Sequence, residues 1–231
     1  MDRGAIATWR DNILHEVVPY LPGELESRFN DVIADPLGRV FCGTMSTDKA
    51  KGRLYRLDRD GSIHLLLEEV GCSNGMAFTL DHTGFFYTDS FAREIYLFDY
   101  RKEDGGISNR RVFARFEEAD GMPDGITLDS KGQLWCALWG GGGIVRLGTT
   151  GKIETKIEIP TPKTSSLTFG GLDYHNIYIT TADGHIRDFD RSAAGSLFKT
   201  MSQVAGRPEF FSRIEPTSRD KKRSEKASIH P

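Results

Sequence analysis

The sequence predicts an all-β fold, a β-propeller whose blades each have four antiparallel strands. A short apolar strand, a turn and a second strand rich in aromatic residues recur at intervals of about 45 residues, which is typical of propeller blades. Hairpins with alternating apolar and polar residues lie between these copies and turn on Asp-Gly or other glycine-containing loops. No segment longer than a turn has the 3.6-residue periodicity of a helix.

The repeated strand pairs begin with an Asn or Asp residue. The three strong copies are NDVIADPLGRVFCGTM from Asn30, NGMAFTLDHTGFFYTDS from Asn74 and DGITLDSKGQLWCALWGG from Asp124. Each contains a D-x-x-G turn, in which the Asx side chain bonds its own backbone and glycine accepts a positive φ. These turns begin at Asp35, Asp81 and Asp129, and a weaker copy of the pair starts at Ser165. Two extra residues precede the turn after Asn74, so we expect only approximate register there.

Composition indicates a globular chain without a nucleic-acid or membrane partner. Of 231 residues, 38% are hydrophobic and 27% charged, and the net charge is −3. No apolar run has the roughly 18 residues that a membrane span needs. The N-terminus lacks a signal-peptide pattern. The odd cysteine count, Cys42, Cys72 and Cys136, favours buried reduced thiols, and the expected location is cytoplasmic.

The first strand of each propeller blade lines the central channel, so equivalent residues on these strands point toward one axis. Asn30, Asn74 and Asp124 each stand just before such a strand. We expect their side chains to meet at one mouth of the channel. Carboxylate and carboxamide oxygens suit Ca²⁺, Mg²⁺ or Mn²⁺, and Zn²⁺ less well. The alternative is three Asx turns or strand starts without a ligand.

Several segments resemble the regucalcin/gluconolactonase family, also called the senescence marker protein and luciferin-regenerating-enzyme-like family. The segments include SRFNDVIADPLGRVFCGTM, CSNGMAFTLDHTGFFYTDS and MPDGITLDSKGQLWCALWGGGGIVRL, and the resemblance runs from about residue 4 to residue 214. It implies a six-bladed type of propeller, incomplete here at about four to five blades. It also implies one divalent metal ion in the channel and the hydrolysis of sugar lactones and related esters.

The resemblance assigns roles to five positions of this sequence. Asn74 of S-N-G and Asp124 of P-D-G fall on metal ligands, with Asp124 also the catalytic carboxylate that takes a proton from water. Arg28 and Asn30 of R-F-N-D fall on residues that hold substrate hydroxyls. Asp48 stands where some members carry a substrate-binding Glu, and its shorter side chain is a departure. Ca²⁺ is the expected ion, with Zn²⁺, Mg²⁺ and Mn²⁺ as alternatives.

A second departure concerns the third metal ligand. The family's ligand is a Glu in an E-G/S-P-x-W type motif, which this sequence lacks, and Glu16, Glu24 and Glu26 stand in other contexts. We therefore expect a propeller over residues 1–214 with a partial first blade at 1–29, and a charged, disordered tail at 215–231. The expected consequences are self-association through the open blade edge, or the alternative function of a weakly active or non-catalytic metal-binding scaffold.

Overall fold

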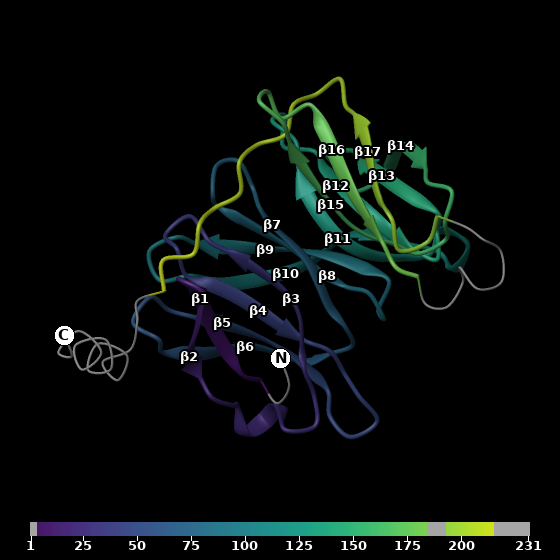
Figure 1. The fold of residues 1–231 in the computed structure, drawn as a ribbon. Helices are drawn as coiled ribbons and strands as arrows, with labels where there is room; N and C mark the ends of the chain where they lie inside the picture. Colours follow the sequence, from purple (N-terminus) through teal and green to yellow (C-terminus); the bar gives the residue numbers. More distant parts are fainter. Residues whose placement is uncertain (1–3, 184–192, 215–231) are drawn as a thin grey trace. The chain divides into compact units, whose positions relative to one another are not determined.

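The computed structural model describes residues 4–183 and 193–214, and these form an almost entirely β structure (Figure 1). The only helical elements in these ranges are two 3-10 turns, η1 (Pro22–Glu24) and η2 (Glu118–Asp120). Over the described residues the structure agrees with the prediction that no segment longer than a turn is helical. Within the same ranges no helix has the length and apolar character needed to cross a membrane. The predicted tail at 215–231 lies outside the described residues.

The strands form antiparallel sheets in which neighbours along the chain are hydrogen-bonded neighbours in space, as in propeller blades. The first four-stranded sheet contains β3 (Phe29–Ala34), β4 (Val40–Thr44), β5 (Gly52–Leu57) and β6 (Ile63–Val70). The second contains β7 (Ser73–Phe78), β8 (Gly84–Asp89), β9 (Glu94–Arg101) and β10 (Gly106–Arg115). The third contains β11 (Met122–Leu128), β12 (Leu134–Trp139), β13 (Gly143–Leu147) and β14 (Ile153–Glu158).

Two smaller sheets complete the described fold. The fourth blade has β15 (Thr164–Gly170), β16 (Asn176–Thr181) and β17 (Leu197–Met201). An N-terminal hairpin pairs β1 (Ile6–Arg10) with β2 (Ile13–Val18). The predicted propeller-type blades of four antiparallel strands are therefore confirmed in three sheets.

The chain divides into two compact units, which we describe separately. The first contains Met1–Val70 and Phe210–Pro231, and the second contains Gly71–Glu209. In the second unit the inner strand β11 lies between the inner strands β7 and β15 (Figure 1). Apolar side chains of successive blades interdigitate there, with Leu128 and Leu134 in one cluster and Ala137 and Leu167 in the next. This packing fixes the spacing of the three inner strands.

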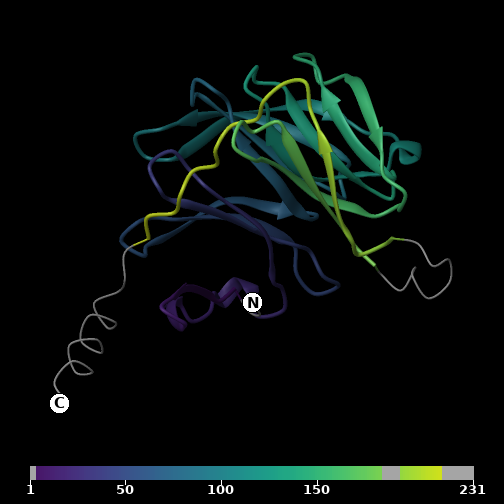
Figure 2. The same ribbon diagram turned by 45° about the horizontal axis from the view of Figure 1, so that its top comes forward.

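In the first unit the N-terminal hairpin packs on the β3–β6 sheet (Figure 2). Val18 and Leu21 share one apolar cluster with Cys42, Tyr55 and Leu57. The hairpin leaves large apolar side chains exposed, namely Trp9, Ile13 and Leu14. Self-association through this open edge stays a prediction.

The three cysteines are free thiols and all are buried, as the sequence indicated. Burial raises the pKa of the Cys42 thiol to about 12 and raises the pKa of Cys136 further. Thiolates are the reactive form, so both side chains belong to the packing of the blades and not to nucleophilic chemistry.

Candidate functional site

Every inner strand carries a β-bulge at the end where the candidate residues lie. The ladder register shifts near this end of β3, β7, β11 and β15, although in β7 the residue left out is Gly75 and Asn74 stays paired with Thr88. The residues in or beside these bulges are Asn30, Asn74 with Gly75, Asp124 with Gly125, and Ser165. A bulge leaves one residue out of the ladder and re-aims its side chain, which is why bulges gather next to active sites.

The opposite end of each inner strand is a turn, and the structure corrects the expected register in the second blade. Asp35 N donates to Arg39 O, and Asp129 N donates to Gln133 O. In the second blade the residue equivalent to these is Thr79, whose N donates to Gly84 O, while Asp81 accepts from Thr83 N, two residues on, as predicted for a turn aspartate. Its Oγ1 accepts from Gly84 N at 2.8 Å, as the carboxylates do in the other turns. Asn74 and Asp124 therefore stand at equivalent positions, because the extra length lies within the turn.

Glycines allow the adjacent strands β7 and β11, which carry Asn74 and Asp124, to approach each other closely. A Cβ on Gly75 would lie 2.5 Å from Asp124 O, so only glycine lets β7 approach β11 this closely. A Cβ on Gly125 would likewise lie 2.7 Å from the Cβ of Ser166 on β15. The N-G and D-G pairs of the sequence are thus contact points between blades as well as bulge residues.

A hydroxyl group links Asn74 to Pro123, the residue before Asp124. Asn74 Nδ2 donates to Ser90 Oγ at 3.1 Å, and Ser90 Oγ donates to Pro123 O at 2.6 Å. Asn74 and Ser90 are both buried. The side chain of Asn74 is thereby tied to the residue that directly precedes Asp124.

The segment carrying Ser90 is itself fixed by a neighbouring carboxylate. Asp89 accepts from Gly71 N and Cys72 N, both at 2.9 Å, and more weakly from Phe91 N at 3.2 Å. Two positions beyond Phe91, Arg93 Nη1 donates to Gly121 O at 2.7 Å. The β8–β9 turn is thus hydrogen-bonded both to the segment just before β7 and to the segment just before β11.

Asp124 is half-buried on the bulge of β11, above the fully buried Cys136. Burial and, to a smaller degree, the Asp124 charge raise the pKa of the Cys136 thiol.

Asp120, the other Asp-Gly aspartate, accepts from Glu117 N at 2.9 Å and caps η2. Trp135 is buried in the core, as expected for the second strand.

In the first unit, Arg28 and Asn30 lie on the same side of β3. Arg28 Nη1 donates to Asn30 Oδ1 at 3.1 Å and to Phe29 O at 3.0 Å. Asp48 is exposed in a loop whose Thr47 Oγ1 donates to Glu26 O at 3.1 Å, so the loop is tied to the segment before Arg28. These candidate substrate residues are neighbours within their unit.

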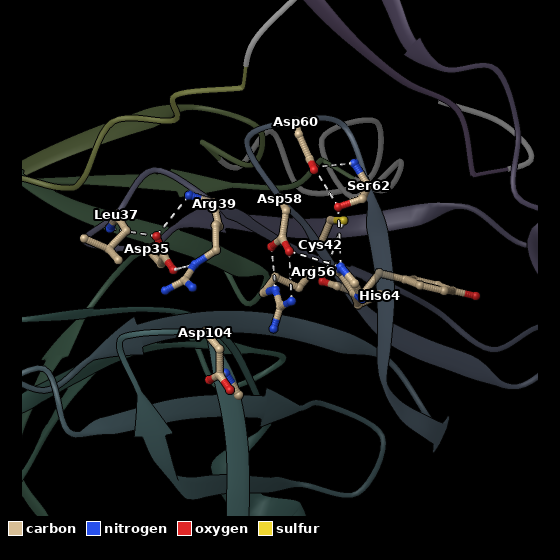
Figure 3. Close-up of polar contacts among 12 residues, drawn as sticks. Asp35, Leu37, Arg39, Cys42, Arg56, Asp58, Asp60, Ser62, His64 and Asp104 are labelled. Carbon is tan, nitrogen blue, oxygen red and sulfur yellow. Dashed lines mark hydrogen bonds and ion pairs between the residues drawn. The ribbon is translucent and has the colours of Figure 1, made fainter. Parts of the chain in front are cut away.

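Other carboxylates of the first unit take part in structural contacts (Figure 3). Asp35 pairs with the buried Arg39 and accepts from Leu37 N at 2.8 Å. Asp58 accepts from Arg56 through two bonds of 2.6 and 2.9 Å, and Asp60 accepts from Ser62 Oγ at 2.7 Å. The predicted turn roles of Asp35 and of the Asp58–Gly61 hairpin are confirmed.

The buried Glu24 likewise has a structural setting. Its Oε1 accepts from Tyr55 OH at 2.7 Å and from Arg53 Nη1 at 3.1 Å, which attaches η1 to β5. Burial, reinforced by the Glu24 carboxylate, raises the pKa of Tyr55.

The structure thus brings Asn74 together with Asp124 in one unit, and Arg28 together with Asn30 and the Asp48 loop in the other. Within residues 4–183 and 193–214, no three His, Cys, Asp or Glu side chains gather as a metal-binding group. The chemistry of Asn74 and Asp124 nevertheless fits a hard cation, since both present oxygen atoms. Sequence reasoning missed Ser90, which lies in the turn after β8 and whose partner Pro123 is distant along the chain.

Comparisons with known proteins agree on one family and one fold. The family model described as the SMP-30/Gluconolactonase/LRE-like region matches residues 2–183. A pentonolactonase, XacC, from Haloferax volcanii is 43% identical over 93% of this chain and 75% of its own length. The match therefore spans nearly all of this sequence.

Solved structures support the same assignment. A luciferin-regenerating enzyme has a TM-score of 0.82 and 28% identity, covering 92% of this chain and 76% of that one. A calcium-binding protein, regucalcin, from Agrobacterium tumefaciens has a TM-score of 0.76 and 25% identity, covering 93% and 78%. The chain spans about three quarters of the length of each of these relatives.

Proposed function

Because the chain belongs to the SMP-30/gluconolactonase/LRE-like family, we propose that it is a lactonase that opens sugar lactones with the help of a divalent metal ion. Asn74 and Asp124 would hold the ion, Asp124 would act as the base, and Arg28, Asn30 and Asp48 would bind the substrate. The 43% identity to a pentonolactonase supports the substrate class. Ca²⁺ is the first choice of ion, and Zn²⁺, Mg²⁺ and Mn²⁺ are the alternatives.

The observation that carries the proposal is the close approach of the Asn74 and Asp124 bulges. A Cβ at Gly75 would lie 2.5 Å from Asp124 O, so the two strands are in contact at their bulges, beside Asn74 and at Asp124. Equivalent bulges bring side chains from different blades to one region, as a shared ligand requires. A turn aspartate such as Asp129 differs, since the donors to its carboxylate come from its own blade.

The proposed reaction is the addition of water to the lactone carbonyl. A bound divalent ion supplies Lewis-acid stabilisation of the carbonyl oxygen, which contributes several kcal/mol in such sites. The oxygen of the attacking water bonds to the carbonyl carbon, and the Asp124 carboxylate takes one proton from that water. The bond from that carbon to the ring oxygen then breaks, the ring oxygen takes the proton, and a hydroxy acid leaves.

The proposed substrate-orienting residues are Arg28, Asn30 and Asp48. Arg28 keeps further N–H groups beyond the Nη1 bonds to Asn30 and Phe29, and these can donate to sugar hydroxyls. The contact with Asn30 limits the rotamers of the Arg28 side chain before substrate arrives, so less entropy is lost on binding. Asp48 in the adjoining loop would accept from a hydroxyl group.

The experiment is an aldonolactone hydrolysis assay with the purified chain, first stripped with a chelator and then titrated with Ca²⁺, Mg²⁺, Mn²⁺ or Zn²⁺. We expect activity that returns with at least one ion in the parent and with none in Asp124→Ala. Thermal shifts in the same titrations report binding separately from turnover. Hydrolysis that the chelator leaves unchanged would overturn the metal-dependent part of the proposal.

A calcium-binding role without catalysis is the second candidate. It is favoured by the regucalcin of similar fold, whose description is that of a calcium-binding protein. A Ca²⁺-dependent thermal shift without hydrolysis of any aldonolactone would select it over the lactonase.

A further inference from the structure

We propose that Ser90 is a positioning residue that fixes the carboxamide of Asn74 so that its oxygen faces the candidate ion. This inference rests on the proposed function, because it assigns a role at the same metal site. It adds a residue from the β8–β9 turn, and its mechanism is the orientation of an amide rather than contact with the ion.

The direction of two hydrogen bonds carries the argument. The Ser90 hydroxyl has one hydrogen, and the carbonyl of Pro123 at 2.6 Å can only accept. Ser90 Oγ must therefore act as the acceptor toward Asn74, at 3.1 Å, and only the Nδ2 end of a carboxamide can donate. Oδ1 of Asn74 is thus turned away from Ser90. Among the described residues Oδ1 accepts no hydrogen bond.

A flipped amide would be costly because the site is buried. Asn74 and Ser90 are 9% and 5% exposed, respectively. In the flipped state Oδ1 would face an oxygen whose hydrogen is already donated, and the NH₂ group would point at the cation. Buried polar groups without partners, and N–H groups directed at a cation, are both unfavourable. Ser90 therefore selects one of two otherwise similar rotamers.

Ser90 is held firmly enough to serve this role. Its backbone N donates to Cys72 O at 3.0 Å, and the preceding Asp89 carboxylate accepts from Gly71 N and Cys72 N. Since Asn74 follows Cys72 by two residues, both ends of the contact are anchored on the same strand entry. The Pro123 bond extends this network to the residue before Asp124.

The first test measures ion affinity by calorimetry in two backgrounds. We expect Ser90→Ala to weaken binding of the ion that the parent prefers by about 10- to 100-fold, the usual effect of losing a residue that orients a metal ligand. In an Asn74→Asp background both terminal atoms are oxygens, so orientation no longer matters. There, Ser90→Ala should change the affinity by less than about threefold. An equal loss in both backgrounds would mean that Ser90 supports the loop and does not orient the amide.

A matched control separates a general loss of stability from this effect. Ser202 is a buried serine of the same unit whose Oγ accepts from Val204 N at 3.1 Å. Ser202→Ala removes a comparable hydrogen bond and should leave ion affinity unchanged. If Ser202→Ala lowers the affinity for the ion as much as Ser90→Ala does, the inference fails.

The second test needs no ion. In the metal-free chain, the Asn74 side-chain NH₂ resonances, assigned by their loss in Asn74→Asp, should exchange slowly and move on Ser90→Ala. Unchanged resonances in Ser90→Ala would overturn the inference directly. If the parent binds no divalent ion while these resonances move as expected, the proposed metal site fails and the positioning of Asn74 by Ser90 stands.

Discussion

Strand β11 carries one aspartate near each end, and the two have different surroundings. Asp129 is fully buried, and its carboxylate accepts from Lys131 N, Gln133 N, Trp135 Nε1 and Arg146 Nε at 2.9 to 3.1 Å. Asp124 is half-buried on a bulge against Gly75 of the next blade. The first carboxylate is enclosed by donors from its own blade, whereas the second lies where two blades meet.

The same difference recurs in β3 and β7. In β3, Asp35 closes the turn with Arg39, and Asn30 lies at the bulge. In β7 the turn position is Thr79, a neutral acceptor, and the bulge position is Asn74. The turn end therefore requires an acceptor for a backbone N–H and tolerates the loss of charge. At the bulge end the ladder is instead interrupted at or beside the candidate residue, where a ligand could bind.

The largest expected effect is at Asp124. Asp124→Ala should lower lactone hydrolysis by about 10³-fold or more, because the base and part of the Lewis-acid stabilisation are lost together. Its midpoint of thermal unfolding without metal should stay close to that of the parent. Steady-state assays and melting curves with and without ion measure both. A variant that keeps its metal-dependent thermal shift would exclude Asp124 as a ligand.

Asp129 should show the opposite pattern. Asp129→Ala leaves Arg146 and the Trp135 indole N–H without their buried acceptor, so we expect a loss of about 3–5 kcal/mol in the free energy of unfolding. Under conditions where the variant is still folded, the affinity for the ion should change little. Denaturant titration with calorimetry on the folded fraction tests this. A stable variant with weakened metal binding would reverse the assignment of the two ends.

The sequence was sufficient to predict the blades, the turn aspartates and the equivalence of Asn30, Asn74 and Asp124. These depend on local patterns, since strand alternation and D-x-x-G turns involve residues close together along the chain. The bulges and the Ser90 contact could not be predicted, because they arise where strands of different blades meet. Ser90 and Pro123 are 33 positions apart, and no spacing rule relates them. In the second turn Asp81 accepts from Thr83 N as predicted, but Thr79 takes the position equivalent to Asp35 and Asp129.

Gly75 tests whether contact between blades is what distinguishes the bulge end. Gly75→Ala places a methyl group against backbone atoms of Asp124 and Ile126, which cannot rotate away. We expect a loss of about 2–3 kcal/mol in unfolding free energy together with weaker ion binding. Gly140→Ala is the control, since no atom lies within 4 Å of the position that its methyl group would take and only its φ of +83° is unfavourable. The control should lose about 1 kcal/mol and keep its ion affinity.

Arg28 tests the proposed substrate role of the β3 bulge end. Arg28→Ala should raise the KM for a polyhydroxylated lactone by about tenfold, the effect of losing one charge-assisted hydrogen bond. The KM for a small unsubstituted lactone should change much less, because that substrate has no hydroxyl groups to bind. Parallel kinetics with both substrates make the comparison. Equal increases would indicate that Arg28 supports Asn30 and does not contact substrate.

The smallest expected effect is at Asp31, one residue beyond the Asn30 bulge. Its titration tests whether this end of β3 tolerates a charge, as the Asp35 end does. Burial raises the pKa of Asp31 from 3.8 to about 6, against the opposing effect of the Val32 N–H that donates to Oδ1. The folded chain therefore binds a proton more tightly than the unfolded chain between these pH values. As the pH rises from about 4 to above 6, ionisation of Asp31 lowers the free energy of unfolding. A shift of about two units corresponds to roughly 3 kcal/mol at most, and the partial exposure of Asp31 reduces this to about 1 kcal/mol.

Asp31→Asn keeps an acceptor for Val32 N and removes the charge. It should therefore stabilise the chain by about 1 kcal/mol at pH 8 and have no effect near pH 4. Urea unfolding at the two pH values measures the difference, with Asp48→Asn on the exposed loop as the control. A variant that is equally stable relative to the parent at both pH values would show that the β3 bulge accommodates a carboxylate without cost. In that case the contrast between the two ends of the inner strands would rest on their hydrogen-bond donors alone and not on their burial.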